Sequence, residues 1–106
     1  MRKNQAVREE LEMLYGAKCM LTDYTTRLNY HHLIKKCNGG KETIDNGAVL
    51  NREAHDFLHE QEYKNKQLYE ELNECLILYK LCLELNETEC LNEWEKVKEQ
   101  VRIRVR

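Results

Sequence analysis

The sequence has no proline, only four glycines and a single phenylalanine among its 106 residues. It has no low-complexity run, no internal repeat and no segment that looks like a flexible linker. The longest apolar run, CLILYKLCLEL, is too short to cross a membrane, which takes about 20 apolar residues. The N-terminal MRKNQAVREE has no apolar core after its basic residues, so we expect no signal peptide. With 42% hydrophobic and 34% charged residues, the chain is typical of one small soluble domain rather than a disordered or membrane protein.

The five cysteines are an odd number, and no two of them have the CxxC spacing of metal-binding or redox motifs. This usage favours reduced thiols and a cytoplasmic location. Cys75 and Cys82 lie seven residues apart in a segment with helical periodicity. We therefore expect them on one face of a helix, as small buried hydrophobic residues.

The net charge of −2 hides an uneven distribution of charge. Residues 1–41 contain eight Lys or Arg and four Asp or Glu, a net charge of +4. Residues 42–101 contain six basic and fifteen acidic residues, a net charge of −9, and the final RIRVR adds +3. We expect a basic, phosphate-facing surface on the N-terminal part and an acidic surface suited to a protein partner on the helical part.

Helical spacing and turn residues together predict an α+β fold. A helix is expected from about residue 4 to residue 15, where Gly16 would end it. Residues 18–34 mix β-forming residues with a polar TDYTT break, which predicts two short strands around a turn. Residues 35–47 contain Asn-Gly-Gly and Asp-Asn-Gly and predict a loop. The AVL sequence at 48–50 predicts a short extended segment, and Asn51 is placed to cap a following helix.

From about residue 61 onward the apolar periodicity predicts further helix. The NETE sequence at 86–89 has the form of a capping box that would begin another helix. The apolar stripes of these two helices are Leu68, Leu72, Leu76 and Leu83 on the first, and Leu91, Trp94 and Val97 on the second. We expect the stripes to pack within the chain or against a second copy in a homodimer.

All four histidines lie between residues 31 and 59. His55 and His59 are four residues apart in a predicted helix, so both imidazoles project from one face and can hold one metal ion. His31 and His32 are neighbours in a predicted strand, where successive side chains point to opposite sides. This arrangement suits one histidine to metal binding and the other to contact with a substrate.

The whole stretch resembles the HNH nuclease motif, also called ββα-metal, and is most similar to its colicin-type DNase form. Asn46 follows His32 by fourteen residues, and His55 follows Asn46 by nine. The paired histidines, Gly39-Gly40, Asp45-Asn46 and the HDFLH sequence at 55–59 all match features of that form. The match is tight over about thirty residues. The resemblance implies an HNH core with an N-terminal helix in residues 1–60, followed by a helical extension in residues 61–106.

The resemblance also assigns roles to residues. His31, His55 and His59 match the ligands of one divalent metal ion, with magnesium, manganese, zinc and nickel as candidates. His32 matches the general base that activates water, and Asn46 matches the central Asn that fixes the loop against the His32 strand and orients the base. The loop lysines Lys35, Lys36 and Lys41 are the candidates for phosphate contacts.

One departure from the family pattern concerns zinc. Many HNH domains carry paired cysteines that bind a structural zinc ion. Here Cys19 is followed by Thr22 at the second position, and Ala54 stands before the helix histidine where a cysteine would be. We therefore expect no structural zinc.

The implied function is metal-dependent hydrolysis of DNA phosphodiester bonds, with nicking of one strand per active site. DNA is the implied partner. Two alternatives stay open: a binding or inhibitory module that keeps the fold with little catalysis, suggested by the acidic helical part, and an RNase toxin that uses the same chemistry.

Overall fold

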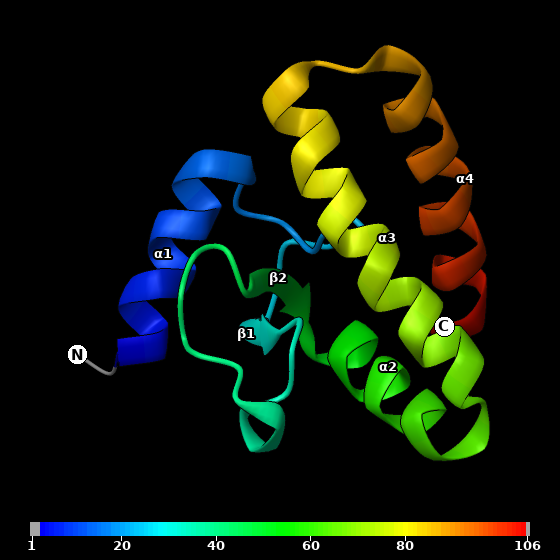
Figure 1. Ribbon diagram of the computed structural model, residues 1–106. Helices are drawn as coiled ribbons and strands as arrows, with labels where there is room; N and C mark the ends of the chain where they lie inside the picture. The colour runs from blue at the N-terminus through cyan, green and yellow to red at the C-terminus, as the bar shows by residue number, and fades with distance from the viewer. Residues whose placement is uncertain (1–2, 106) are drawn as a thin grey trace.

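The computed structural model describes residues 3–105, and these residues form an α+β arrangement of helices around a two-stranded antiparallel sheet (Figure 1). The elements in chain order are α1 (Lys3–Tyr15), β1 (Leu28–His32), the short 3-10 helix η1 (Lys36–Asn38), β2 (Gly47–Asn51), α2 (Arg52–Lys64), α3 (Lys66–Leu85) and α4 (Thr88–Val105). The predicted fold class is confirmed at this level.

The sheet lies between α1 on one side and α2 with α3 on the other, and α4 packs outside α3 (Figure 1). Side chains on β1 alternate between these two sides. A Cβ atom added to Gly47 would lie 2.4 Å from the Tyr30 ring and 2.8 Å from the Leu11 side chain of α1. Tyr30 therefore lies on the α1 side of the sheet. His31, one residue on, points the other way and contacts rings from α2. The alternation of the strand therefore directs His31 and His32 to opposite sides of the sheet.

The two strands are not the pair that the sequence predicted. Only the second predicted strand forms, as β1, and its partner is β2 across the loop of residues 33–46. Residues 18–27 instead form turns, with positive φ at Asp23 and Arg27. Met20 donates its backbone N–H to Val49 rather than to a following strand. The prediction of a hairpin within residues 18–34 is wrong because this segment packs its apolar residues into the core beside β2.

Helix α4 covers the 18–27 segment. The Trp94 indole donates to the Met20 carbonyl oxygen at 2.9 Å, and Arg102 donates to the Thr22 carbonyl oxygen at 3.1 Å. The buried ammonium of Lys98 lies 2.9 Å from the Asp23 carboxylate. The contacts to the Met20 and Thr22 carbonyl oxygens satisfy backbone groups that a sheet would otherwise have to pair.

The ends of the helices follow local signals in most places. Gly16, with φ at 105°, ends α1 through a hydrogen bond to Glu12. Asn51 caps α2 as predicted, because its side chain accepts from the Ala54 N–H. A second asparagine, Asn65, separates α2 from α3 and caps the latter. One prediction is wrong: Asn86 does not begin α4 but ends α3 in the left-handed conformation, which asparagine tolerates.

The apolar stripes of the helical half pack largely within the chain. Leu72 and Leu76 of α3 are buried in the core, and Trp94 of α4 stacks on Tyr79 at 4.7 Å between ring centroids. The exposed apolar side chains of α3 lie on its other face: Ile77, Leu78, Leu81 and Leu85. None of the helices in the described part of the chain is long and apolar enough to cross a bilayer.

Two cysteines differ from the prediction. Cys82 of α3 and Cys90 of α4 form a disulfide across the turn that joins the helices. The expectation of reduced thiols is therefore wrong for this pair, while Cys19, Cys37 and Cys75 are free. Because disulfides persist mainly in oxidising compartments, the bond removes the ground on which a cytoplasmic location was expected.

Candidate metal centre

Three histidines from two elements meet on the α2 side of the sheet. His31 comes from the end of β1, and His55 and His59 come from successive turns of α2. One ring nitrogen from each lies within 4.8 Å of the other two. Among the described residues, these three histidines form the one group whose ligand atoms lie close enough together to share a metal ion. The Nε2 atoms of His55 and His59 are 3.1 Å apart. The predicted ligand set is thus brought together.

The environment of His31 fits a metal ligand. Its ring is 1% exposed, and its Nε2 lies 2.7 Å from the Oδ1 atom of Asn73 on α3. Its other nitrogen, Nδ1, is buried and has no hydrogen-bond partner. A buried polar atom without a partner is costly, and a metal ion would remove that cost. The residues present therefore fit the group that the resemblance implies.

Two of these histidines, His31 and His55, are held in the form that binds metal. Burial lowers the pKa of the His31 imidazole to about 3, although its hydrogen bond with Asn73 opposes the shift. Burial also lowers the pKa of His55, and the neighbouring His59 adds to that effect. Both imidazoles are consequently neutral near pH 7, and a neutral imidazole offers the lone pair that coordinates a cation.

Glu62 lies beside the third ligand. Its Oε1 atom is 3.7 Å from Nδ1 of His59, one turn back on α2, so the carboxylate faces the nitrogen that does not face His55. Glu62 also forms an ion pair with Lys35 from the loop. Lys35, a predicted phosphate contact, therefore has a carboxylate partner. Both residues border a hollow of about 530 Å³ between the loop and α3.

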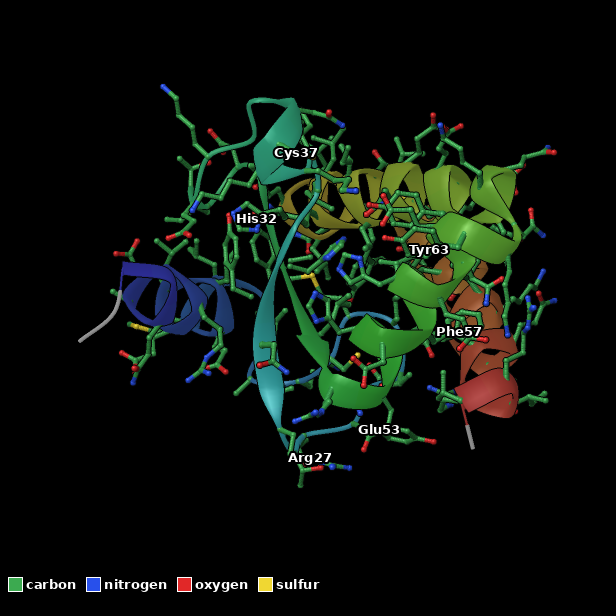
Figure 2. All side chains as sticks on the ribbon, turned by 90° about the horizontal axis from the view of Figure 1, so that it is seen from below. Arg27, His32, Cys37, Glu53, Phe57 and Tyr63 are labelled. Atoms are coloured by element: carbon green, nitrogen blue, oxygen red, sulfur yellow. A yellow bond between two sulfur atoms is a disulfide. The ribbon has the colours of Figure 1, made fainter. Side chains whose placement is uncertain are left out.

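His32 lies outside the three-histidine group, on the α1 side of the sheet, where its ring meets Tyr30 edge-on at 4.9 Å. Figure 2 shows it near the loop that carries Cys37. It borders a hollow of about 360 Å³ together with Lys36 and Lys41, so two of the three predicted phosphate contacts lie beside it. Its Nε2 is 4.0 Å from Glu42 and has no hydrogen-bond partner.

Asn46 closes the loop that joins the two strands. Its Oδ1 atom accepts from the Ile34 N–H at 2.7 Å, and its Nδ2 donates to the carbonyl oxygens of Ile34 and Lys41 at 3.1 and 2.9 Å. These bonds hold the loop against the end of the strand that carries His32. They do not reach the His32 ring, so the structure brings Asn46 to the loop and not to the base.

Gly40 is needed for this closure. A Cβ atom at Gly40 would lie 1.8 Å from the Ile34 carbonyl oxygen and 2.9 Å from Nδ2 of Asn46. From the other side, Lys80 of α3 donates to the carbonyl oxygens of Ile44 and Gly47 at 2.5 and 2.7 Å. The backbone around Asn46 is therefore held from both sides.

Sequence reasoning missed the polar residues behind the histidines. Glu62 follows His59 by three residues in a helical pattern, so helical spacing could have indicated it. Asn73 lies 42 residues from His31, and no local pattern connects the two. In the sequence, Lys80 is only a charged residue that interrupts an apolar helix. The fold alone places it against the loop.

Comparison with protein-family models, with curated proteins and with solved structures found no match.

Proposed function

We propose that the protein is a metal-dependent endonuclease of the HNH type that hydrolyses phosphodiester bonds in DNA. The observation that carries the proposal is the convergence of ring nitrogens from His31, His55 and His59, in a group where Nδ1 of His31 is buried and has no hydrogen-bond partner. Three imidazole ligands leave further coordination positions for water or a phosphate oxygen, as in catalytic metal sites. A divalent ion bound there would stabilise negative charge on the phosphate and on the leaving 3′ oxygen.

The protein's own residues would supply the remaining chemistry. His32 occupies the next position on β1 after His31. In the proposed reaction its neutral ring accepts a proton from the attacking water. Lys36 and Lys41 border the same hollow and would hold phosphate oxygens beside the base. Lys35 would contribute less, because Glu62 already pairs with it.

The proposal is tested by incubating the purified protein with supercoiled plasmid in magnesium, manganese, zinc or nickel, with a chelator as the metal-free reference. Conversion to nicked circles in at least one metal, and its loss in the chelator, is the expected result. An equally purified His32→Ala protein controls for a contaminating nuclease. Adding unlabelled RNA as competitor separates a DNase from an RNase, which would use the same site.

A result without cleavage in any metal would favour the second candidate, a binding module. Its supporting observation is the exposed apolar face of α3, formed by Ile77, Leu78, Leu81 and Leu85. We take a second copy of the chain as the occupant, because two such apolar faces that pack against each other are both removed from water. The apolar stripes that the sequence predicted for a dimer pack largely within the chain. A dimer would therefore form through the outer face of α3. Sedimentation at tens of micromolar tests it: a strict monomer would exclude the dimer and leave the face to another protein.

A further inference from the structure

We propose that Asn73 of α3 is a positioning residue of the metal site, whose side-chain amide sets the tautomer of His31 so that Nδ1 faces the metal. The proposal rests on the metal site of the proposed function. It adds a residue from the helical extension, outside the stretch that resembles the HNH motif.

The orientation of the Asn73 amide follows from its two hydrogen bonds. Its Nδ2 atom donates to the backbone carbonyl oxygen of Tyr69 at 3.0 Å. A carbonyl oxygen can only accept, so the amide nitrogen must lie on the Tyr69 side and Oδ1 must lie toward His31. The opposite orientation would place two oxygens against each other and is excluded by the same chemistry.

The tautomer of His31 then follows from the amide. Oδ1 of Asn73 accepts only, and it lies 2.7 Å from Nε2 of His31, so Nε2 must carry the proton. A neutral imidazole has one proton, and Nδ1 therefore carries the lone pair. This Nδ1 is the buried atom that has no protein partner. The amide thus leaves the lone pair of His31 on the nitrogen that is free to bind a cation.

Asn73 differs from the other polar neighbour of the site. Glu62 is a carboxylate near the surface and is shared with Lys35, whereas Asn73 is buried and its amide has no charged partner. Hydrogen bonds of this kind orient metal-binding histidines, and their removal typically costs about 10- to 100-fold in metal affinity. The helical extension consequently takes part in the site instead of only covering it.

The tautomer can be measured without metal or DNA, by long-range proton–nitrogen correlation spectra of the imidazole rings. In the metal-free wild-type protein we expect His31 in a single form with the proton on Nε2. Asn73→Asp keeps an oxygen acceptor, so Nε2 of His31 should stay protonated. Asn73→Leu removes the acceptor at similar size and should give a mixture of tautomers. A proton on Nδ1 of His31 in the wild type would overturn the proposal.

Metal affinity provides the second measurement, by calorimetric titration with zinc alone. Asn73→Leu should bind about 10- to 100-fold more weakly than the wild type, and Asn73→Asp should stay close to it. Leu83→Ala, a packing change on the same helix, controls for a general loss of stability and should keep wild-type affinity. Equal affinity of Asn73→Leu and wild type would contradict the proposal.

The outcomes for the two proposals are separable. If the wild type bound no metal, the proposed nuclease would lose its centre, while the spectra would still decide the assignment of Asn73. If Asn73→Leu failed to fold, the wild-type tautomer and the Asn73→Asp variant would decide it. If the wild type showed the expected His31 tautomer but did not nick plasmid, the nuclease proposal alone would fail.

Discussion

His31 and His32 are adjacent in the chain but face opposite sides of the sheet, and this separates their proposed roles. His31 points to α2 and joins His55 and His59, whereas His32 points to the α1 side and lies with Lys36 and Lys41. The alternation of a β-strand is sufficient to produce this division. It gives each histidine a distinct mutational signature.

Replacing His32 by alanine should abolish nicking and leave the metal site intact. A lost general base costs on the order of 10²-fold or more in rate, whereas His32 is not among the converging ligands. Plasmid nicking and zinc titration, performed on the same protein, check the two halves of this expectation. Asn29→Ala, an exposed change on the same strand, should nick like the wild type. Wild-type nicking by His32→Ala would refute the assigned base.

Replacing His55 or His59 should instead weaken metal binding itself. Each variant removes one of three imidazoles, and we expect an affinity loss of at least about 10-fold, with activity lost in parallel. Calorimetric titration is the measurement. Glu60→Ala lies on the same helix, pairs with Lys64 at the surface and should bind normally. Unchanged affinity in both histidine variants would exclude the three-histidine site.

At the scale of elements, the loop of residues 33–46 is as important as the strands that it connects. Asn46 joins its two ends, Gly40 allows the backbone to approach closely, and Lys80 holds it from α3. The loop also carries Lys36 and Lys41 and borders the hollow beside His32. Its conformation therefore governs how the proposed base and the phosphate contacts are presented.

Two adjacent glycines in this loop should respond differently to the same substitution. Gly40→Ala would place a Cβ atom against the backbone of Ile34, so the loop must shift and nicking should fall sharply. Gly39→Ala meets no atom within 4 Å and is disfavoured only by its φ of 89°, which costs about 1–2 kcal/mol.

Thermal unfolding and plasmid nicking of both glycine variants check the difference. The strain at Gly39 lowers stability, but it does not displace the Ile34 end of the loop. Equal effects of the two changes on nicking would show that the close approach at Gly40 is not needed.

At the scale of the whole molecule, α3 and α4 form a unit that reaches both the metal site and the 18–27 segment. Asn73 and Lys80 extend from α3 to the sheet and its loop, and Trp94 extends from α4 to Met20. The disulfide joins the two helices at their far end. Cys82 lies nine residues beyond Asn73, roughly 13 Å along the helix axis at about 1.5 Å per residue.

Breaking this disulfide should lower stability without altering the metal site. A bond that closes a loop of this size contributes about 2–3 kcal/mol, because it restricts the unfolded chain. We expect Cys82→Ala with Cys90→Ala to unfold at lower denaturant concentration and to bind zinc like the wild type. Cys75→Ala, which removes a free thiol from the same helix, is the matched control. Equal stability of the double variant and the wild type under oxidising conditions would contradict the prediction, whereas reduction of the wild type should remove the difference between them.

The local features of this protein were readable from its sequence. Helical periodicity and the Asn51 cap located α2, and the spacing of His55 and His59 placed both rings on one face of it. The glycine at 16 marked the end of α1. Each of these depends on residues within a few positions of one another, where backbone geometry alone relates side chains. The HNH-type assignment and the nuclease activity stay predictions, because they rest on a motif and not on a measured reaction.

Tertiary structure decided what local geometry leaves open. Residues 18–21 were as suited to a strand as to a buried turn, and contacts from α4 to Met20, Thr22 and Asp23 favoured the turn. Asn86 could begin one helix or end another, and in the folded chain its left-handed backbone and its N–H bond to the Cys82 carbonyl oxygen make it an end. The partner of His31 could not be read at all, because Asn73 reaches it only after two elements 42 residues apart have packed together. Spacing in the sequence determined which histidines share a face, and packing determined which nitrogen of His31 is left for a ligand.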